Sequence, residues 1–200
     1  MIRPNPTSKA GTGALLMVLA TSLWACDTAT APEIDPPHAV VAASPGSVGA
    51  AMLADAAPIV ATIRRSTEKY HRAEVAVDEG FAAASGCVAV PGLGGMGLHY
   101  AAMSRLGDAE VDPSRPEVIL YEPSAHGLRM VGVEFLVVAD AWDVAHAEPP
   151  ALLGVEFDEH RGADTHGLPF DHYELHVWSW RHNPSGLTAP FNPKVSCDGA

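Results

Sequence analysis

The chain has 200 residues, which is enough for one domain of ordinary size. It carries 24 acidic against 12 basic residues, a formal net charge of −12 with neutral histidine. A chain this acidic lacks the basic surface that releases counterions from a nucleic-acid backbone, so we expect no nucleic-acid partner.

The first 25 residues have the features of an export signal. Arg3 and Lys9 form a basic start, and the apolar run 14–25 is too short to span a bilayer as a mature helix. Leu23, two intervening residues and Cys26 resemble the lipobox of bacterial lipoproteins, although Trp24 departs from its usual pattern. The resemblance implies cleavage before Cys26 and its lipidation, with palmitate among the acyl chains. A plain secretory signal cut nearby is the alternative, and both interpretations predict export.

The composition divides the rest of the chain into two parts. Residues 26–47 contain the lipidated cysteine and a tether rich in proline and alanine, and residues 48–200 form a single globular domain. More than one acyl chain holds a protein stably on a membrane. We therefore expect an exported protein anchored by lipid to the bacterial cell envelope, with the membrane as its partner.

The domain is predicted to begin with helix. Asp55 is a suitable N-cap, and Pro58 is tolerated in the first helical turn. Apolar residues recur at helical spacing from Ile59 to Tyr70, and a second helical piece covers 72–80. The pattern predicts either one bent helix or two short ones.

The signals change to strands from Cys87 onward. A glycine-rich bend at 92–97 is expected to allow close backbone approach or a bulge. Residues 128–138 are long, β-branched and mostly apolar, which predicts a central strand. Further strand-like runs lie at 87–90, 117–123 and 172–177. Helices first and strands afterwards predict an α+β fold, with the N-terminal helix or helix pair packed on a mainly antiparallel β-sheet.

Two cysteines remain if Cys26 carries lipid. Export places Cys87 and Cys197 in an oxidising compartment, where a thiol pair tends to close. Such a disulfide would tie the C-terminal tail to the segment that follows the helices. Two free buried thiols, or a metal-binding pair, are the alternatives.

The segment 172–177 alternates polar and apolar residues. As a strand it turns His172, Glu174 and His176 to one face, and its tyrosine and valine, with the two tryptophans that follow, favour a strand over a helix. At about 3.3 Å per residue the two histidines lie roughly 13 Å apart, too far to share one ion. Only neighbours two residues apart can chelate together, so other ligands must come from other strands.

His99 and Glu134 are the best candidates for those other ligands. Each is a polar residue beside apolar sequence that we expect to be buried, and a buried charge needs a partner. Histidine with carboxylate suits a divalent transition metal such as Zn, Fe, Mn or Cu. The predicted metal ligands are therefore His99, Glu134, His172, Glu174 and His176.

A less specific interpretation competes with this metal site. Alternating polar residues are also typical of a half-solvated sheet, and Glu134 could pair with Arg129 or Arg181. The protein would then be a non-catalytic envelope lipoprotein that binds a protein or an envelope component. The sequence leaves open whether the protein is an enzyme.

A set of motifs is shared with a group of uncharacterised exported bacterial proteins. The chain resembles that group over roughly residues 60–197, through GMGLHY, EVILYEP, LRMVGVEFLVV, HYELHVWSWRHNPSG and FNPKVSC. The resemblance implies one fold unit over this range. It implies no activity, and no catalytic residue is carried over from it.

Overall fold

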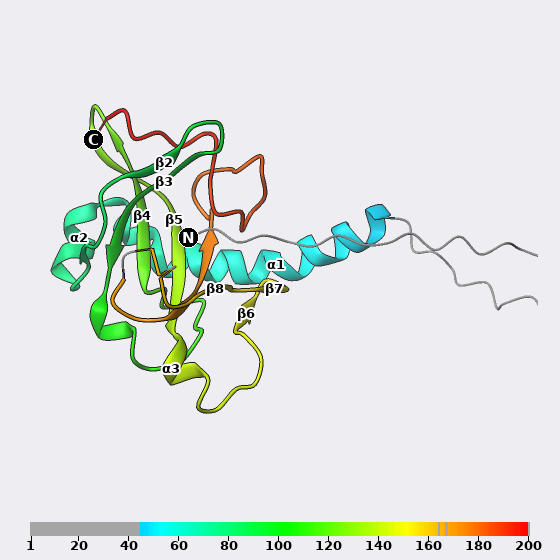
Figure 1. Cartoon of the computed structure of the whole chain (residues 1–200). Helices are drawn as coiled ribbons and strands as arrows, with labels where there is room; N and C mark the ends of the chain where they lie inside the picture. The colour runs from blue at the N-terminus through cyan, green and yellow to red at the C-terminus, as the bar shows by residue number, and fades with distance from the viewer. Residues whose placement is uncertain (1–44, 164, 167, 200) are drawn as a thin grey trace, which may run out of the picture. The chain divides into compact units, whose positions relative to one another are not determined.

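The computed structural model describes residues 45–163, 165–166 and 168–199 (Figure 1). The predicted signal peptide, the lipidation site Cys26 and all but the last three residues of the predicted tether lie outside the described residues.

The N-terminal helical region is longer than predicted. Helix α1 covers Pro45–Thr67, the 3-10 turn η1 covers Glu68–His71, and α2 covers Ala73–Asp78. The prediction that Asp55 caps the helix is wrong, because the helix begins ten residues earlier and passes through Pro58. Pro58 is exposed and has no backbone N–H to donate within the helix. Ile63 on the same helix is completely buried, and this apolar packing outweighs the lost hydrogen bond.

The predicted mainly antiparallel sheet is confirmed. Its main path runs β1-β3-β4-β5-β9-β8, and β2 pairs with β3 outside that path. The strands are β1 (Ala82–Ala83), β2 (Val88–Val90), β3 (Gly94–Ala101), β4 (Val118–Ser124), β5 (Gly127–Val138), β8 (Asp158–His160) and β9 (His172–Val177). The remaining elements are η2 (Met103–Arg105), α3 (Ala139–Trp142) and the hairpin of β6 (Ala151–Leu152) and β7 (Val155–Glu156). β5 lies between β4 and β9, as its apolar composition predicted.

The two faces of the sheet bury different side chains. One face packs against the helical region, where α1 runs across the strands, and there Ile63 joins Ile119, Phe135 and Leu175 in one core (Figure 1). We call this the helix side. Side chains alternate between the two faces along a strand, so Leu136, next to Phe135, points to the other face. There it belongs to a second group of buried apolar residues. The fold is therefore α+β, with the helical region on one face of the sheet only.

The glycine-rich segment 92–97 is mostly strand rather than the predicted bend. Gly94 opens β3 with a φ of 97°, and a Cβ at this position would lie 2.2 Å from the carbonyl oxygen of Asn192. Gly95 pairs with Asn192 through both backbone hydrogen bonds, at 3.0 and 3.1 Å. Glycine thus lets the C-terminal tail lie directly on the strand, which is the close backbone approach that the sequence predicted.

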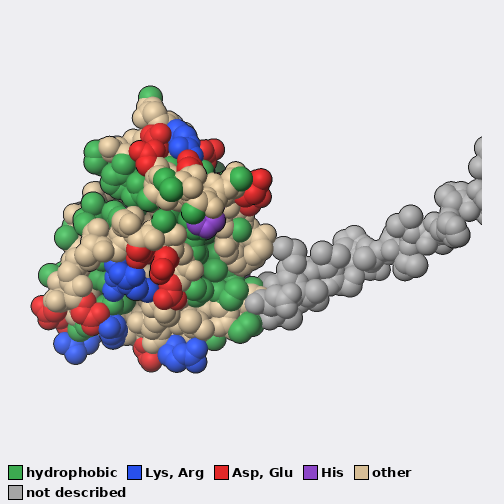
Figure 2. All heavy atoms as spheres, turned by 90° about the horizontal axis from the view of Figure 1, so that it is seen from below, with side chains coloured by type: hydrophobic (Ala, Val, Ile, Leu, Met, Phe, Trp, Pro, Cys, Tyr) green, Lys and Arg blue, Asp and Glu red, His purple; other side chains and the backbone are tan. Residues whose placement is uncertain are grey.

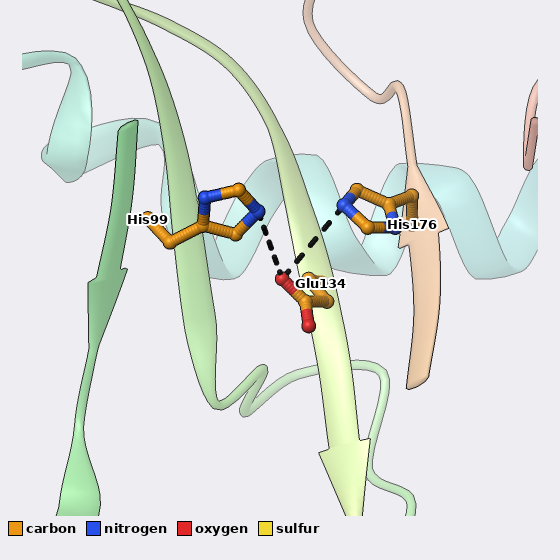
Figure 3. Close-up of side chains that lie close together, drawn as sticks. All are labelled: His99, Glu134 and His176. Carbon is orange, nitrogen blue, oxygen red and sulfur yellow. Dashed lines mark ion pairs between the residues drawn. The ribbon is translucent and has the colours of Figure 1, made fainter. Parts of the chain in front are cut away.

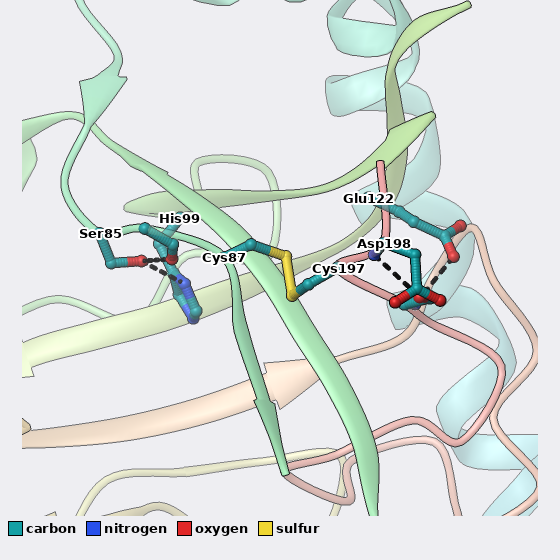
Figure 4. Close-up of a disulfide and its surroundings, with 8 residues drawn as sticks. Ser85, Cys87, His99, Glu122, Cys197 and Asp198 are labelled. Carbon is teal, nitrogen blue, oxygen red and sulfur yellow. Dashed lines mark hydrogen bonds between the residues drawn. A yellow bond between two sulfur atoms is a disulfide. The ribbon is translucent and has the colours of Figure 1, made fainter. Parts of the chain in front are cut away.

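The predicted disulfide holds this tail in place. Cys87 and Cys197 are bonded, with Cα atoms 5.7 Å apart, across 110 residues of sequence (Figure 4). Beside it, Glu122 accepts a hydrogen bond from the backbone of Ser196 at 3.0 Å and pairs with Arg129. The crosslink and these contacts fix the tail against β2, β3 and β4.

The surface carries charges of both signs. On the face drawn in Figure 2, acidic and basic side chains lie beside one another among hydrophobic ones, without a large patch of one sign. Within the part of the chain that the structure describes, no helix is both long enough and apolar enough to cross a membrane.

Candidate metal centre

Three of the predicted ligands come together on the face of the sheet away from the helices. His99 lies on β3, Glu134 on β5 and His176 on β9 (Figure 3). Glu134 and His176 are direct cross-strand partners, and His99 reaches Glu134 diagonally across β4. We call these three residues the first cluster. Three separate strands supply its side chains, so the sheet register sets its geometry.

The ligand atoms of the first cluster converge on one carboxylate oxygen. Glu134 Oε2 lies 3.4 Å from His99 Nε2 and 3.8 Å from His176 Nε2, and the three ligand atoms lie within 4.8 Å of one another. A tetrahedral ion with bonds of about 2.1 Å holds its ligand atoms roughly 3.4 Å apart. The spacing is therefore close to that of a metal site and needs only small side-chain movements.

These side chains are buried, and two of their ligand atoms lack hydrogen bonds. The side-chain exposed fractions are 13% for His99 and 3% for both Glu134 and His176. Glu134 Oε2 and His176 Nε2 make no hydrogen bond to any described residue. A buried polar atom left without a partner costs about 1–3 kcal/mol, so a pair of them at one point requires an explanation.

Ser85 determines which nitrogen of His99 carries the proton. The Ser85 hydroxyl donates its hydrogen to the carbonyl oxygen of Gly86 at 2.9 Å, and it also lies 2.9 Å from His99 Nδ1 (Figure 4). Since the hydroxyl has one hydrogen, it must accept from Nδ1–H. A neutral His99 ring then presents a lone pair at Nε2, which is the nitrogen that faces Glu134. Metal-binding histidines are commonly oriented by a bond to their other nitrogen in this way.

The environment also favours uncharged side chains in the first cluster. Burial lowers the pKa of His99 to about 4, with a further contribution from the charge of His176. Burial likewise lowers the pKa of His176. Burial raises the pKa of Glu134 well above its usual range, and the charge of Glu174 raises it further. Two neutral imidazoles thus face a carboxyl group that holds its proton until a cation replaces it.

The predicted alternative partners of Glu134 are occupied elsewhere. Arg129 pairs with Glu122. Arg181 donates a hydrogen bond to the backbone carbonyl of Lys194 at 3.0 Å. Among the ion pairs that the structure describes, Glu134 contacts only the two histidines of the first cluster. The interpretation of Glu134 as half of an arginine pair is therefore wrong.

The other two predicted ligands lie apart from the first cluster. The segment 172–177 is a strand, as predicted, and Glu174 approaches His160 and His166 instead of His99. The fully buried His172 lies beside Glu174. His160 and His166 were not among the predicted ligands, and the only signal for them in the sequence is the high number of histidines toward the C-terminus. Metal binding by any of these residues stays a prediction.

One cavity of about 570 Å³ contains both groups of ligands. It is lined by all three residues of the first cluster and also by His160, His166 and Glu174. Most of its remaining wall is apolar and includes Val88, Met96, Leu106, Leu136, Phe170 and Phe191. The cavity is large enough for a small organic molecule next to the histidines.

Comparison with known proteins does not identify a relative. No family model, curated protein or solved structure matches this chain. The resemblance to a group of exported bacterial proteins therefore stays a prediction.

Proposed function

We propose that this protein binds a divalent transition-metal ion through His99, Glu134 and His176. The observation that carries the proposal is the convergence of two imidazole nitrogens on one buried carboxylate oxygen, at 3.4 and 3.8 Å. A cation at this point would satisfy Glu134 Oε2 and His176 Nε2, which otherwise lack hydrogen bonds.

The set of ligands suits catalytic rather than purely structural metal sites. Two histidines and one carboxylate leave at least one coordination position open, as in hydrolytic zinc enzymes and non-haem iron enzymes. The neighbouring cavity provides room for a ligand at that position. A bound ion would supply a Lewis acid that activates water or polarises a carbonyl or phosphoryl oxygen. Zn, Fe, Mn and Cu all accept this donor set.

Elemental analysis of the folded domain tests the proposal. Protein stripped with EDTA is incubated with Zn²⁺, desalted and analysed for metal per chain. We expect stoichiometric uptake by the wild type. The nearly isosteric Glu134→Gln and the substitution His176→Ala are each expected to weaken zinc binding at this site at least 100-fold, because each removes one of three ligands.

A matched control separates this site from histidine content in general. His126 is exposed in the turn between β4 and β5, so His126→Ala removes one histidine without touching the cavity. This variant should bind zinc like the wild type. If the wild type takes up no metal and its melting temperature is unchanged by EDTA, the metal proposal is wrong. A non-catalytic envelope lipoprotein would then be the better interpretation.

We also propose that the domain is exported and anchored to the bacterial cell envelope by lipid on Cys26. The support is the sequence of residues 1–26, together with the disulfide, since disulfides persist mainly in oxidising compartments. In cells fed radiolabelled palmitate, the wild-type chain should incorporate label and fractionate with membranes. Cys26→Ala should do neither. An unlabelled wild-type chain would contradict the anchor.

A further inference from the structure

A second group of ligand atoms lies in the same cavity. Glu174 Oε1 is 3.4 Å from His160 Nε2 and 3.6 Å from His166 Nδ1, and the three ligand atoms lie within 4.8 Å of one another. The two imidazole rings are 4.1 Å apart between centroids. We call these three residues the second cluster. Its donor set, two histidines and one glutamate, is the same as that of the first cluster.

The sheet and one loop bring the second cluster together. His160 ends β8, directly opposite His172 on β9, and Glu174 lies two residues further along β9 on the same face. His166 comes from the loop between these strands. His160 and Glu174 are largely buried, with side-chain exposed fractions of 12% and 9%, whereas His166 is about half exposed at 48%. The cluster therefore has two ligands fixed on strands and a third near solvent.

A third histidine, His172, lies beside Glu174 in a fully buried position. Its Nδ1 lies 3.3 Å from the carbonyl oxygen of Phe170, which can only accept, so Nδ1 carries a hydrogen. In the neutral ring Nε2 then has a lone pair. That nitrogen is buried, makes no hydrogen bond to a described residue and lies 3.4 Å from Glu174 Oε2. His172 Nε2 and Glu174 Oε2 thus form a further close nitrogen–oxygen pair beside the second cluster.

The two clusters adjoin within the cavity. Glu174 and His176 are two residues apart on the same face of β9, and Glu134 is the cross-strand partner of His176. The side chains of Glu134 and Glu174 both line this cavity. A second divalent ion would offset the negative charge that these two carboxylates bring together when both are ionised.

We infer that the cavity binds a second divalent metal ion at His160, His166 and Glu174, next to the ion proposed at the first cluster. The inference rests on the proposed function for the first ion and extends it from a one-ion to a two-ion centre. In enzymes with two divalent ions, the pair stabilises both the attacking and the leaving oxygen of a displacement reaction. His172 acts as a positioning residue: it contacts Glu174 and so holds this carboxylate in place for the second ion.

Metal stoichiometry of paired variants tests this inference. The EDTA-stripped domain is titrated with Zn²⁺ by calorimetry, and metal per chain is measured after desalting. We expect two ions for the wild type and one for each of the double variants His160→Ala with His166→Ala and His99→Ala with His176→Ala. Circular dichroism checks that each variant is folded. Glu174→Gln, which keeps the side-chain volume, provides a second test of the second cluster and should also lose one ion.

The possible results separate the two proposals. One ion in the wild type, lost in the His99/His176 variant and kept in the His160/His166 variant, overturns the second site and leaves the proposed function standing. One ion that only the His160/His166 variant loses contradicts the proposed function and the two-ion centre together. No uptake by the folded wild type overturns both. Co²⁺ added in place of Zn²⁺ should give visible absorption that saturates at two equivalents.

Discussion

The two faces of the central sheet are built by neighbouring residues of the same strands, yet they differ in the hydrogen bonding of their buried polar atoms. On the helix side, Tyr121 donates to the backbone carbonyl of Tyr70 at 2.7 Å, and Trp180 donates to Thr67 at 3.2 Å. On the cavity side Glu134 Oε2, His172 Nε2 and His176 Nε2 make no hydrogen bond to described residues. The difference supports the proposal that the cavity side binds a metal ion, whereas the helix side contributes mainly to stability.

Because strand residues alternate between the two faces, two neighbouring substitutions can test the two faces separately. Phe135 is fully buried in the helix-side core, while Glu134 beside it points into the cavity. A change at one position should therefore affect stability, and a change at the next should affect binding. Three predictions test this contrast.

The largest expected effect is on the helix side. Phe135→Ala should lower the free energy of unfolding by about 3–5 kcal/mol, because it removes a large buried side chain and leaves a cavity. Urea denaturation of the metal-free domain measures the change. Under conditions where it remains folded, the variant should bind zinc with wild-type stoichiometry.

Glu134→Gln serves as the matched comparison one residue away. Its effect on the unfolding of the metal-free domain should stay within about 1 kcal/mol, because glutamine resembles the protonated carboxyl that burial favours. If Glu134→Gln destabilised the metal-free domain as much as Phe135→Ala, the separation of the two faces would be wrong.

A smaller effect is expected for a buried carboxyl that belongs to neither cluster. Glu117 is buried and accepts a hydrogen bond from the backbone of Leu136 at 3.2 Å. Burial raises the pKa of Glu117 from 4.5 to about 7. Between these values the folded chain keeps a proton that the unfolded chain has lost, so stability is greatest at low pH and falls as the pH rises through 7.

Glu117→Gln should abolish this part of the pH dependence. The difference in unfolding free energy between wild type and variant should change by on the order of 3 kcal/mol from pH 4 to pH 8, in favour of the variant at pH 8. Urea denaturation in EDTA across this range provides the measurement. A constant difference would show that Glu117 titrates alike in the folded and unfolded chains.

The smallest expected effect concerns the orientation of a single ring. Ser85→Ala removes the acceptor for His99 Nδ1–H, and loss of such an outer partner typically weakens metal binding about 10- to 100-fold. Competition with a chromophoric chelator gives the zinc affinity. Ser104→Ala, which changes an exposed serine, is the control. Equal affinities of the two variants would argue against the role of Ser85.

Much of the fold was accessible from the sequence because it depends on local pattern. The period of two in 172–177 predicted the strand and the common face of His172, Glu174 and His176. The apolar run 128–138 predicted the central position of β5, and two cysteines together with the predicted export signal predicted the crosslink. The start of α1 was not predicted, since residues before Asp55 have no regular apolar period and resemble a tether.

The site was accessible only in part, because ligands in a sheet are brought together by register. His99 and Glu134 were predicted from their apolar surroundings, yet nothing in the sequence shows that Glu134 pairs with His176 rather than with an arginine. His160 lies on a three-residue strand and His166 in a loop, so neither has a local pattern to reveal it. The separation of Glu174 from the three predicted ligands of the first cluster depends on this pairing.

The crosslink from Cys87 to Cys197 closes a covalent ring that includes every residue of both clusters, whereas α1, η1 and α2 lie outside it. A single proteolytic nick anywhere within the ring therefore leaves all six side chains on one covalently connected molecule. At the proposed location in the cell envelope, this arrangement would let a chain nicked by proteases keep all of its proposed metal ligands.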